Sequence, residues 1–180
     1  MQMIWQNLED WQNSILSPSL ADWLTHKESM TRRVYELTGY TFRVALRCHT
    51  WQSPRMYEAE LLQIDTQQLA LVREVDLFCS HETWMYARAV FSAAFVRQVP
   101  ALRDLGTQPL GQILFQYPVQ RSDFEICLLE PTNAMYPLAT RALSNSIEPV
   151  WARRSCLKIN DATMLLTEFF LPDMIHAIEV

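Results

Sequence analysis

The stretch LALVREVDLFCSHETWMYARAVF, residues 69–91, contains two consecutive runs whose side chains alternate between the two faces of an extended backbone. In the first run, 69–78, apolar residues such as Leu71 and Val75 fall on one face. The second run, 83–91, is equally rich in apolar and aromatic side chains. Such runs are typical of β-strands, so we predict two strands here.

Further strand-like runs lie on both sides of this stretch. They span residues 40–47, 56–64, 125–129, 152–159 and 164–170. A succession of short strands of this kind indicates an antiparallel sheet. The sequence therefore predicts a protein whose central feature is one such sheet.

Helices are predicted mainly before the first predicted strand and after the fourth. Apolar residues at helical spacing indicate an amphipathic helix within residues 4–15. Ser19 is expected to cap a second short helix, and a third spans 29–37 before Gly39. The remaining predicted helices span 99–105 and 109–115, with a further turn at 138–143 inside a variable excursion from 131 to 149. Together these elements predict an α+β fold.

Length and composition are those of one globular domain, residues 1–180, with 49% hydrophobic and 19% charged residues. No apolar run approaches the roughly 20 residues that cross a bilayer, and the first residues lack the layout of a signal peptide. We therefore expect a cytoplasmic protein with no integral membrane segment. Nothing in the sequence requires more than a monomer.

Charge and metal-ligating residues argue against several classes of function. A net charge of −5 does not favour a nucleic-acid binder, which needs clustered Lys and Arg. The four cysteines and four histidines are scattered and form no CxxC or HExxH pattern. We therefore expect neither a metal site nor a cofactor.

Four charged residues interrupt apolar strand faces. Arg73 shares a face with Leu71 and Val75, whereas Arg88, Arg153 and Glu168 lie on apolar faces of the later strands. A buried charge needs a partner, because isolation from water costs several kcal/mol. One interpretation is a structural Arg73–Glu168 ion pair. The other is a site for a small dianion, because three arginines exceed one carboxylate and guanidinium groups pair well with carboxylates.

Four blocks of sequence extend this second interpretation. They are SLADWL at 19–24 with ESMTRR at 28–33, VREV at 72–75 with WMYAR at 84–88, LG at 105–106 with PLG at 109–111 and LF at 114–115, and RRS at 153–155 with LTEFFLP at 166–172. In this order and spacing the blocks resemble the chorismate lyase family of ubiquinone biosynthesis. The resemblance covers most of the chain.

The resemblance implies an antiparallel sheet of about six strands with helical flaps over a buried site, and conversion of chorismate to 4-hydroxybenzoate and pyruvate. It implies that Arg73 binds the ring carboxylate, that Glu168 lies near the ring hydroxyl, and that backbone groups at Met30 and Leu110 contribute from the flaps. We expect Arg73 and Glu168 to be the catalytic residues. Arg88 or Arg153 is then expected to meet the second carboxylate.

Several points stay open from sequence alone. Glu168 can be a base or only an orienting group, and a 3-hydroxybenzoate product is an alternative to 4-hydroxybenzoate. A different class of function is a non-catalytic module for small aromatic acids, because ligand domains of some transcription regulators share this fold. Only about forty residues precede the first predicted strand, and they lack a basic recognition helix. That favours the enzyme.

Overall fold

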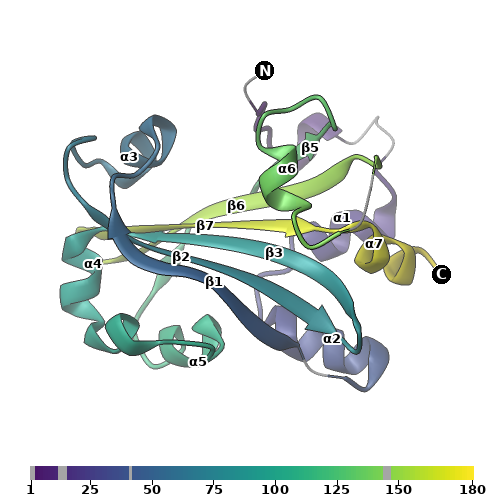
Figure 1. Cartoon of the computed structure of the whole chain (residues 1–180), viewed down its shortest axis with the longest axis horizontal. Coiled ribbons are helices and arrows are strands. Elements are labelled where there is room, and N and C mark those ends of the chain that lie inside the picture. The colour runs from purple at the N-terminus through teal and green to yellow at the C-terminus, as the bar shows by residue number, and fades with distance from the viewer. Residues whose placement is uncertain (1–2, 12–15, 41, 144–146) are drawn as a thin grey trace.

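One antiparallel sheet of seven strands forms the centre of the molecule (Figure 1). In the computed structural model, residues 3–11, 16–40, 42–143 and 147–180 are described. The strands are β1 (Arg43–Gln52), β2 (Ala70–Cys79), β3 (Glu82–Phe91), β4 (Gln120–Arg121), β5 (Glu125–Leu129), β6 (Val150–Ile159) and β7 (Ala162–Phe170). Their order is β1-β2-β3-β7-β6-β4, and β5 also pairs with β6. The predicted α+β fold is confirmed.

Two tight hairpins set the register of the sheet. Ser80 begins the turn between β2 and β3, and Asn160 begins the turn between β6 and β7, both with a positive φ, 55° and 52°. Positive φ in a short turn matches the twist of the flanking strands. The resulting register places Arg73 opposite Ala89 and Arg153 opposite Glu168.

Helices cover both faces of this sheet (Figure 1). The α-helices are α1 (Pro18–Leu24), α2 (Met30–Thr38), α3 (Met56–Leu62), α4 (Ala93–Gln98), α5 (Leu110–Leu114), α6 (Tyr136–Ala139) and α7 (Pro172–Glu179), with 3-10 helices η1 (Leu8–Trp11) and η2 (Pro100–Asp104). Elements α4, η2 and α5 pack on the face that carries Arg73 and Ala89, which we call the pocket face. Elements α3 and α6 pack on the opposite, far face.

Several predicted helices are found close to the expected places. Ser29 caps α2 by accepting a hydrogen bond from the Arg32 backbone N–H, and Gly39 ends it with a φ of 74°. Ser17, not Ser19, caps α1, and the Ser19 hydroxyl instead donates to the carbonyl of Ile178. Within the predicted helix 4–15 only η1 is helical among the described residues, and positions 12–15 lie outside them.

The prediction of a strand at 56–64 is wrong, because this segment contains the helix α3. Glu, Ala and Leu, which dominate this segment, are good helix formers. The helix buries Glu58, Ala59 and Leu62 against the far face. The excursion after residue 130 also packs there, through Tyr136 and Ala139 of α6, and so lies away from the pocket face. No helix in the described ranges is long and apolar enough to cross a membrane.

Candidate active site

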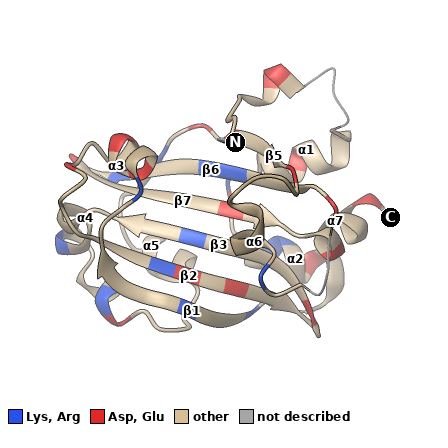
Figure 2. Ribbon diagram, turned by 45° about the horizontal axis from the view of Figure 1, so that its top comes forward, with Lys and Arg blue, Asp and Glu red and all other residues tan. Residues whose placement is uncertain are grey.

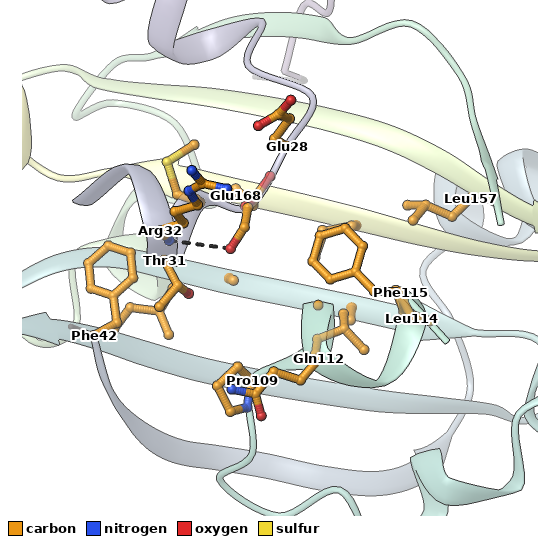
Figure 3. A pocket seen from close by; sticks show the side chains of 18 of the residues that line it. Glu28, Thr31, Arg32, Phe42, Pro109, Gln112, Leu114, Phe115, Leu157 and Glu168 are labelled. Carbon is orange, nitrogen blue, oxygen red and sulfur yellow. Dashed lines mark hydrogen bonds between the residues drawn. The ribbon is translucent and has the colours of Figure 1, made fainter. Parts of the chain in front are cut away.

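A cavity of about 590 Å³ lies between the pocket face and two helical segments. The first segment, residues 27–35, includes the start of α2, and we call it the first flap. The second, residues 106–117, includes α5, and we call it the second flap. In Figure 3, side chains of the first flap such as Thr31 and side chains of the second flap such as Gln112 approach the cavity from different sides. A ligand in this cavity is covered by both flaps.

Two alanines form the floor of the cavity. Ala87 and Ala89 of β3 point into it, and their small side chains leave space that a larger residue would fill. Ala89 lies opposite Arg73 on β2, and Ala87 lies opposite Glu168 on β7. The floor therefore separates a cation on one side from a carboxylate on the other.

Arg73 is a buried cation that no carboxylate neutralises within the described part of the chain. Its side chain is 4% exposed, and Nη2 donates to the carbonyls of Gly106 and Gln108 at 3.0 and 2.9 Å. Nη1 makes no hydrogen bond to any described residue. Burial lowers the pKa of the guanidinium to about 10, because the charged form is poorly solvated. An anion in the cavity would relieve this cost.

Glu168 pairs with Arg153 and not with Arg73, so the alternative of an Arg73–Glu168 ion pair is wrong. Arg153 Nε donates to Glu168 Oε2 at 2.7 Å. Arg153 Nη1 also donates to the carbonyl of Trp23, in the last turn of α1, at 3.2 Å, and to that of His26, just after the helix, at 2.8 Å. Glu168 Oε1 accepts no hydrogen bond from the described residues, and this side chain lines the cavity. One carboxylate oxygen is therefore available to a ligand.

The flap residues expected from sequence also border the cavity. Met30, the first residue of α2, is 8% exposed and lines it from the first flap. Leu110, the first residue of α5, lines it from the second flap. The structure thus brings Met30, Leu110, Arg73, Glu168 and Arg153 together around one space.

Arg88 is not part of this group, which corrects the expectation that it meets a ligand. Side chains alternate along β3, and Ala87 and Ala89 point into the cavity, so Arg88 points to the far face. There Nε and Nη2 donate to Glu58 at 2.6 and 2.9 Å, and Nη1 donates to Glu74. Figure 2 shows that basic and acidic positions lie next to one another across β2, β3, β7 and β6. Arg88 is a structural residue.

Arg121, which no sequence pattern indicated, also lines the cavity, from β4. Its Nη1 donates to Ser155 Oγ at 2.8 Å. Burial lowers the pKa of Arg121, the charge of Glu168 raises it, and the charge of Arg153 lowers it, with a net decrease. Strand β4 has two residues, so no alternation pattern could have indicated which way this side chain points.

Comparison with known proteins now decides the family. The family model described as chorismate lyase matches residues 1–180. The chain belongs to the chorismate lyase family. A relative from Methylococcus capsulatus, named "Probable chorismate pyruvate-lyase", is 35% identical over 162 residues, which cover 89% of this chain and 99% of the relative. A relative of the same name from Pseudomonas aeruginosa is 33% identical over 163 residues, covering 89% of this chain and 88% of the relative.

Solved structures similar to this member of the chorismate lyase family include the ligand-binding domain of a GntR-family transcriptional regulator from Bordetella bronchiseptica, with a TM-score of 0.56 and 12% identity, covering 73% of this chain and 86% of that chain. The C-terminal domain of PhnF matches with a TM-score of 0.62 and 12% identity, covering 83% of this chain and 96% of that domain. PhnF from Mycobacterium smegmatis matches with a TM-score of 0.59 and 13% identity, covering 82% of this chain and 65% of that chain. At such low identity these matches show a shared fold alone.

Proposed function

We propose that this protein converts chorismate to 4-hydroxybenzoate and pyruvate, the first step of the ubiquinone ring pathway. The observation that carries the proposal is Arg73, a buried guanidinium with no carboxylate partner in the described ranges, which faces a covered cavity. Family membership supplies the substrate class. A carboxylate of chorismate would neutralise Arg73 through charge-assisted hydrogen bonds.

The reaction breaks the ether bond between ring carbon 3 and the enolpyruvyl oxygen, and it removes the hydrogen from ring carbon 4. The ring then becomes aromatic and keeps its carboxylate and hydroxyl, while the side chain leaves and becomes pyruvate by gaining a proton at its methylene carbon. Aromatisation makes the overall change strongly favourable. The enzyme therefore has to hold the substrate in a reactive geometry and exclude water more than it has to supply a strong catalyst.

Each residue of the site has a role in this proposal. Arg73 holds the ring carboxylate, and the available oxygen of Glu168 accepts a hydrogen bond from the ring hydroxyl. Arg153 positions Glu168 by binding its other oxygen and by joining it to the chain after α1. The proton on ring carbon 4 passes either to Glu168 or directly to the enolpyruvyl methylene. A pH profile of turnover separates these routes, because only a basic Glu168 imposes its own titration on the rate.

The decisive experiment mixes purified protein with chorismate and follows 4-hydroxybenzoate by absorbance and pyruvate by a coupled assay. We expect equal amounts of both products, and the same rate after treatment with EDTA and dialysis. Formation of 3-hydroxybenzoate would contradict the proposed product. Binding of 4-hydroxybenzoate without turnover would instead support a non-catalytic module for aromatic acids.

A further inference from the structure

The cationic side chains that line the cavity differ in whether a carboxylate neutralises them. Three of them are paired: Lys27 with Asp123 at 3.2 Å, Arg32 with Glu36 at 2.8 Å, and Arg153 with Glu168 at 2.7 Å. Arg73 and Arg121 pair with no carboxylate among the described residues. These two arginines are therefore the places where the cavity can accept added negative charge.

The register of the sheet shows that the two arginines stand on opposite sides of the floor. Arg73 on β2 lies opposite Ala89, Ala89 lies opposite Leu166, and Leu166 lies opposite Ser155 on β6. Three strand spacings of about 4.8 Å put the Cα atoms of Arg73 and Ser155 roughly 14 Å apart along this row. Arg121 reaches the Ser155 end of the row, since it donates to the Ser155 hydroxyl. The two arginines therefore enter the cavity from opposite sides of its floor, as contact with two separate carboxylates of one ligand requires.

Arg121 is also held in place before any ligand arrives. Its partner Ser155 is 3% exposed, and its guanidinium carbon lies 5.3 Å from the centre of the Phe124 ring. The neighbouring lining residues Val119 and Leu157 are apolar. A guanidinium oriented in this way, with little competing water, forms strong hydrogen bonds to a carboxylate.

Arg153, the residue expected from sequence to meet the second carboxylate, is already occupied. Its Nε donates to Glu168, and its Nη1 donates to backbone carbonyls at the end of α1 and to that of His26. Its charge is also neutralised by Glu168. Only Arg153 Nη2 makes no hydrogen bond to the described residues, and a carboxylate there would meet a charge that Glu168 already neutralises. At Arg121 a carboxylate would displace no ion pair among the described residues.

We propose that Arg121, fixed by Ser155, binds the enolpyruvyl carboxylate of chorismate while Arg73 binds the ring carboxylate. This inference rests on the proposed function. After the ether bond breaks, the carboxylate at Arg121 belongs to pyruvate, and the one at Arg73 belongs to the aromatic product. Arg121 therefore contributes to affinity for the substrate and not for 4-hydroxybenzoate, which distinguishes it from Arg73.

The test compares two stable ligands that differ only in the second carboxylate. They are 3-carboxymethoxy-4-hydroxybenzoate and its matched control 3-methoxy-4-hydroxybenzoate, with binding measured by calorimetry. In Arg121→Gln we expect affinity for the dicarboxylate to fall about 10- to 100-fold, the range for a lost hydrogen bond to a charged group. Affinity for the methoxy compound should stay within about twofold, since the remaining contacts are unchanged. In the same variant, KM for chorismate should rise, in parallel with the loss of affinity for the dicarboxylate.

Two further variants complete the design. Arg97→Gln removes an exposed arginine of α4 outside the cavity, so it controls for the change in net charge. Ser155→Ala keeps Arg121 but removes its anchor, and should weaken dicarboxylate binding in the same direction by a smaller factor. It also provides a second test if Arg121→Gln does not fold.

The possible results separate this inference from the proposed function. Unchanged dicarboxylate affinity in Arg121→Gln and in Ser155→Ala, together with normal turnover of chorismate by the unmodified protein, would overturn the Arg121 subsite and leave the function standing. An equal loss for both ligands would assign Arg121 a structural role and also overturn the subsite. If the unmodified protein neither converts chorismate nor binds either compound, the proposed function itself fails.

Discussion

Arg153 Nε lies 2.7 Å from Glu168 Oε2, and the two residues face each other across β6 and β7. The same guanidinium donates to the carbonyls of Trp23 and His26, so a single side chain connects the sheet, the carboxylate and the segment before the first flap. Arg153 is 2% exposed. Removing either member of this pair leaves the other charge buried without compensation, so their substitutions are informative about both stability and catalysis.

Glu168→Gln tests the role of this carboxylate. Glutamine keeps the size of the side chain but removes the negative charge that holds Arg153 and accepts the ring hydroxyl. We expect kcat to fall by at least about tenfold, while the affinity for 4-hydroxybenzoate changes less, because the carboxylate contact at Arg73 remains. Single-turnover kinetics and calorimetry measure the two effects separately. A lower melting temperature with unchanged kcat would show a purely structural ion pair.

Arg73→Ala should act mainly on binding. The substitution removes a buried contact to the ring carboxylate, which both chorismate and 4-hydroxybenzoate carry. Affinity for 4-hydroxybenzoate should decrease by about 2 to 4 kcal/mol, the range for truncating a buried charged hydrogen-bond partner. Calorimetry with the product measures this without turnover. Arg97→Ala, on the exposed side of α4, should bind normally. Product affinity within twofold of the unmodified protein would exclude Arg73 from the carboxylate site.

Arg88 should affect stability and leave product binding intact. Arg88→Ala leaves Glu58, which is 1% exposed, without its guanidinium partner on the far face. Breaking a buried pair in this way typically costs about 3 to 5 kcal/mol of unfolding free energy. Urea unfolding measures the loss, and the folded fraction should still bind 4-hydroxybenzoate with normal affinity. A selective loss of binding with unchanged stability would show that Arg88 contributes to the ligand site and contradict its structural role.

How far the site could be predicted from sequence depends on strand length. Arg73 and Glu168 lie in strands of ten and nine residues, where alternation shows that they share a face with apolar side chains. Strand β3 is buried on both faces from Thr83 to Phe91, so its own pattern could not show that Arg88 points away from the cavity. That information lies in the pairing of Arg73 with Ala89, which no single sequence displays. Arg121, in a strand of two residues, had no pattern at all.

The fold was predictable to a similar degree. The long strands and the end of α2 at Gly39 follow from local chemistry, and each was found where expected, whereas the cap predicted at Ser19 is at Ser17. The strand prediction for 56–64 failed because a short apolar run is compatible with a strand and with a helix. The contact between Glu58 and Arg88, which fixes this segment on the sheet, joins residues 30 positions apart. Local pattern thus identified the elements whose own residues favour one structure, and failed where a contact between distant residues, here Glu58 and Arg88, joins the segment to the rest of the fold.

Stability should fall below neutral pH partly because of His49. Burial and the charge of Arg73 lower the pKa of His49 below its usual 6.5, while a hydrogen bond to the backbone of Leu102 and the charge of Asp104 raise it by less. The unfolded chain then binds a proton at a higher pH than the folded chain. Between the two pKa values the unfolded state carries more protons, so folding is favoured less as the pH decreases through 6.5.

His49→Gln should therefore reduce the loss of unfolding free energy between about pH 7.5 and about pH 5.5. Urea unfolding at both pH values checks this for the variant and the unmodified protein. His26, whose pKa burial also lowers, contributes in the same direction and should account for part of the remaining slope. If the unfolding free energy depends on pH equally in both proteins, His49 does not cause the loss of stability.

Product release should limit turnover. The product keeps the carboxylate and the hydroxyl, the groups proposed to contact Arg73 and Glu168, and the two flaps cover the cavity that holds it. It should therefore bind at least as well as the substrate and leave only when a flap moves. We expect a rapid burst of 4-hydroxybenzoate, equal to the enzyme concentration, followed by a slower steady rate. Stopped-flow absorbance measures both phases.

Substitutions in the second flap locate the motion that release requires. Gly111 lies inside α5, and an added Cβ would meet the ring of Phe115 at 3.4 Å, an ordinary contact, so Gly111→Ala should fold and stiffen this helix by about 0.5 to 1 kcal/mol. If the flap bends there, the burst stays and the steady phase slows. Gly106 has a φ of 53°, and its carbonyl holds Arg73, so Gly106→Ala should additionally weaken product binding. A linear time course in the unmodified protein, with inhibition by product only at millimolar concentration, would mean that the flaps do not control release.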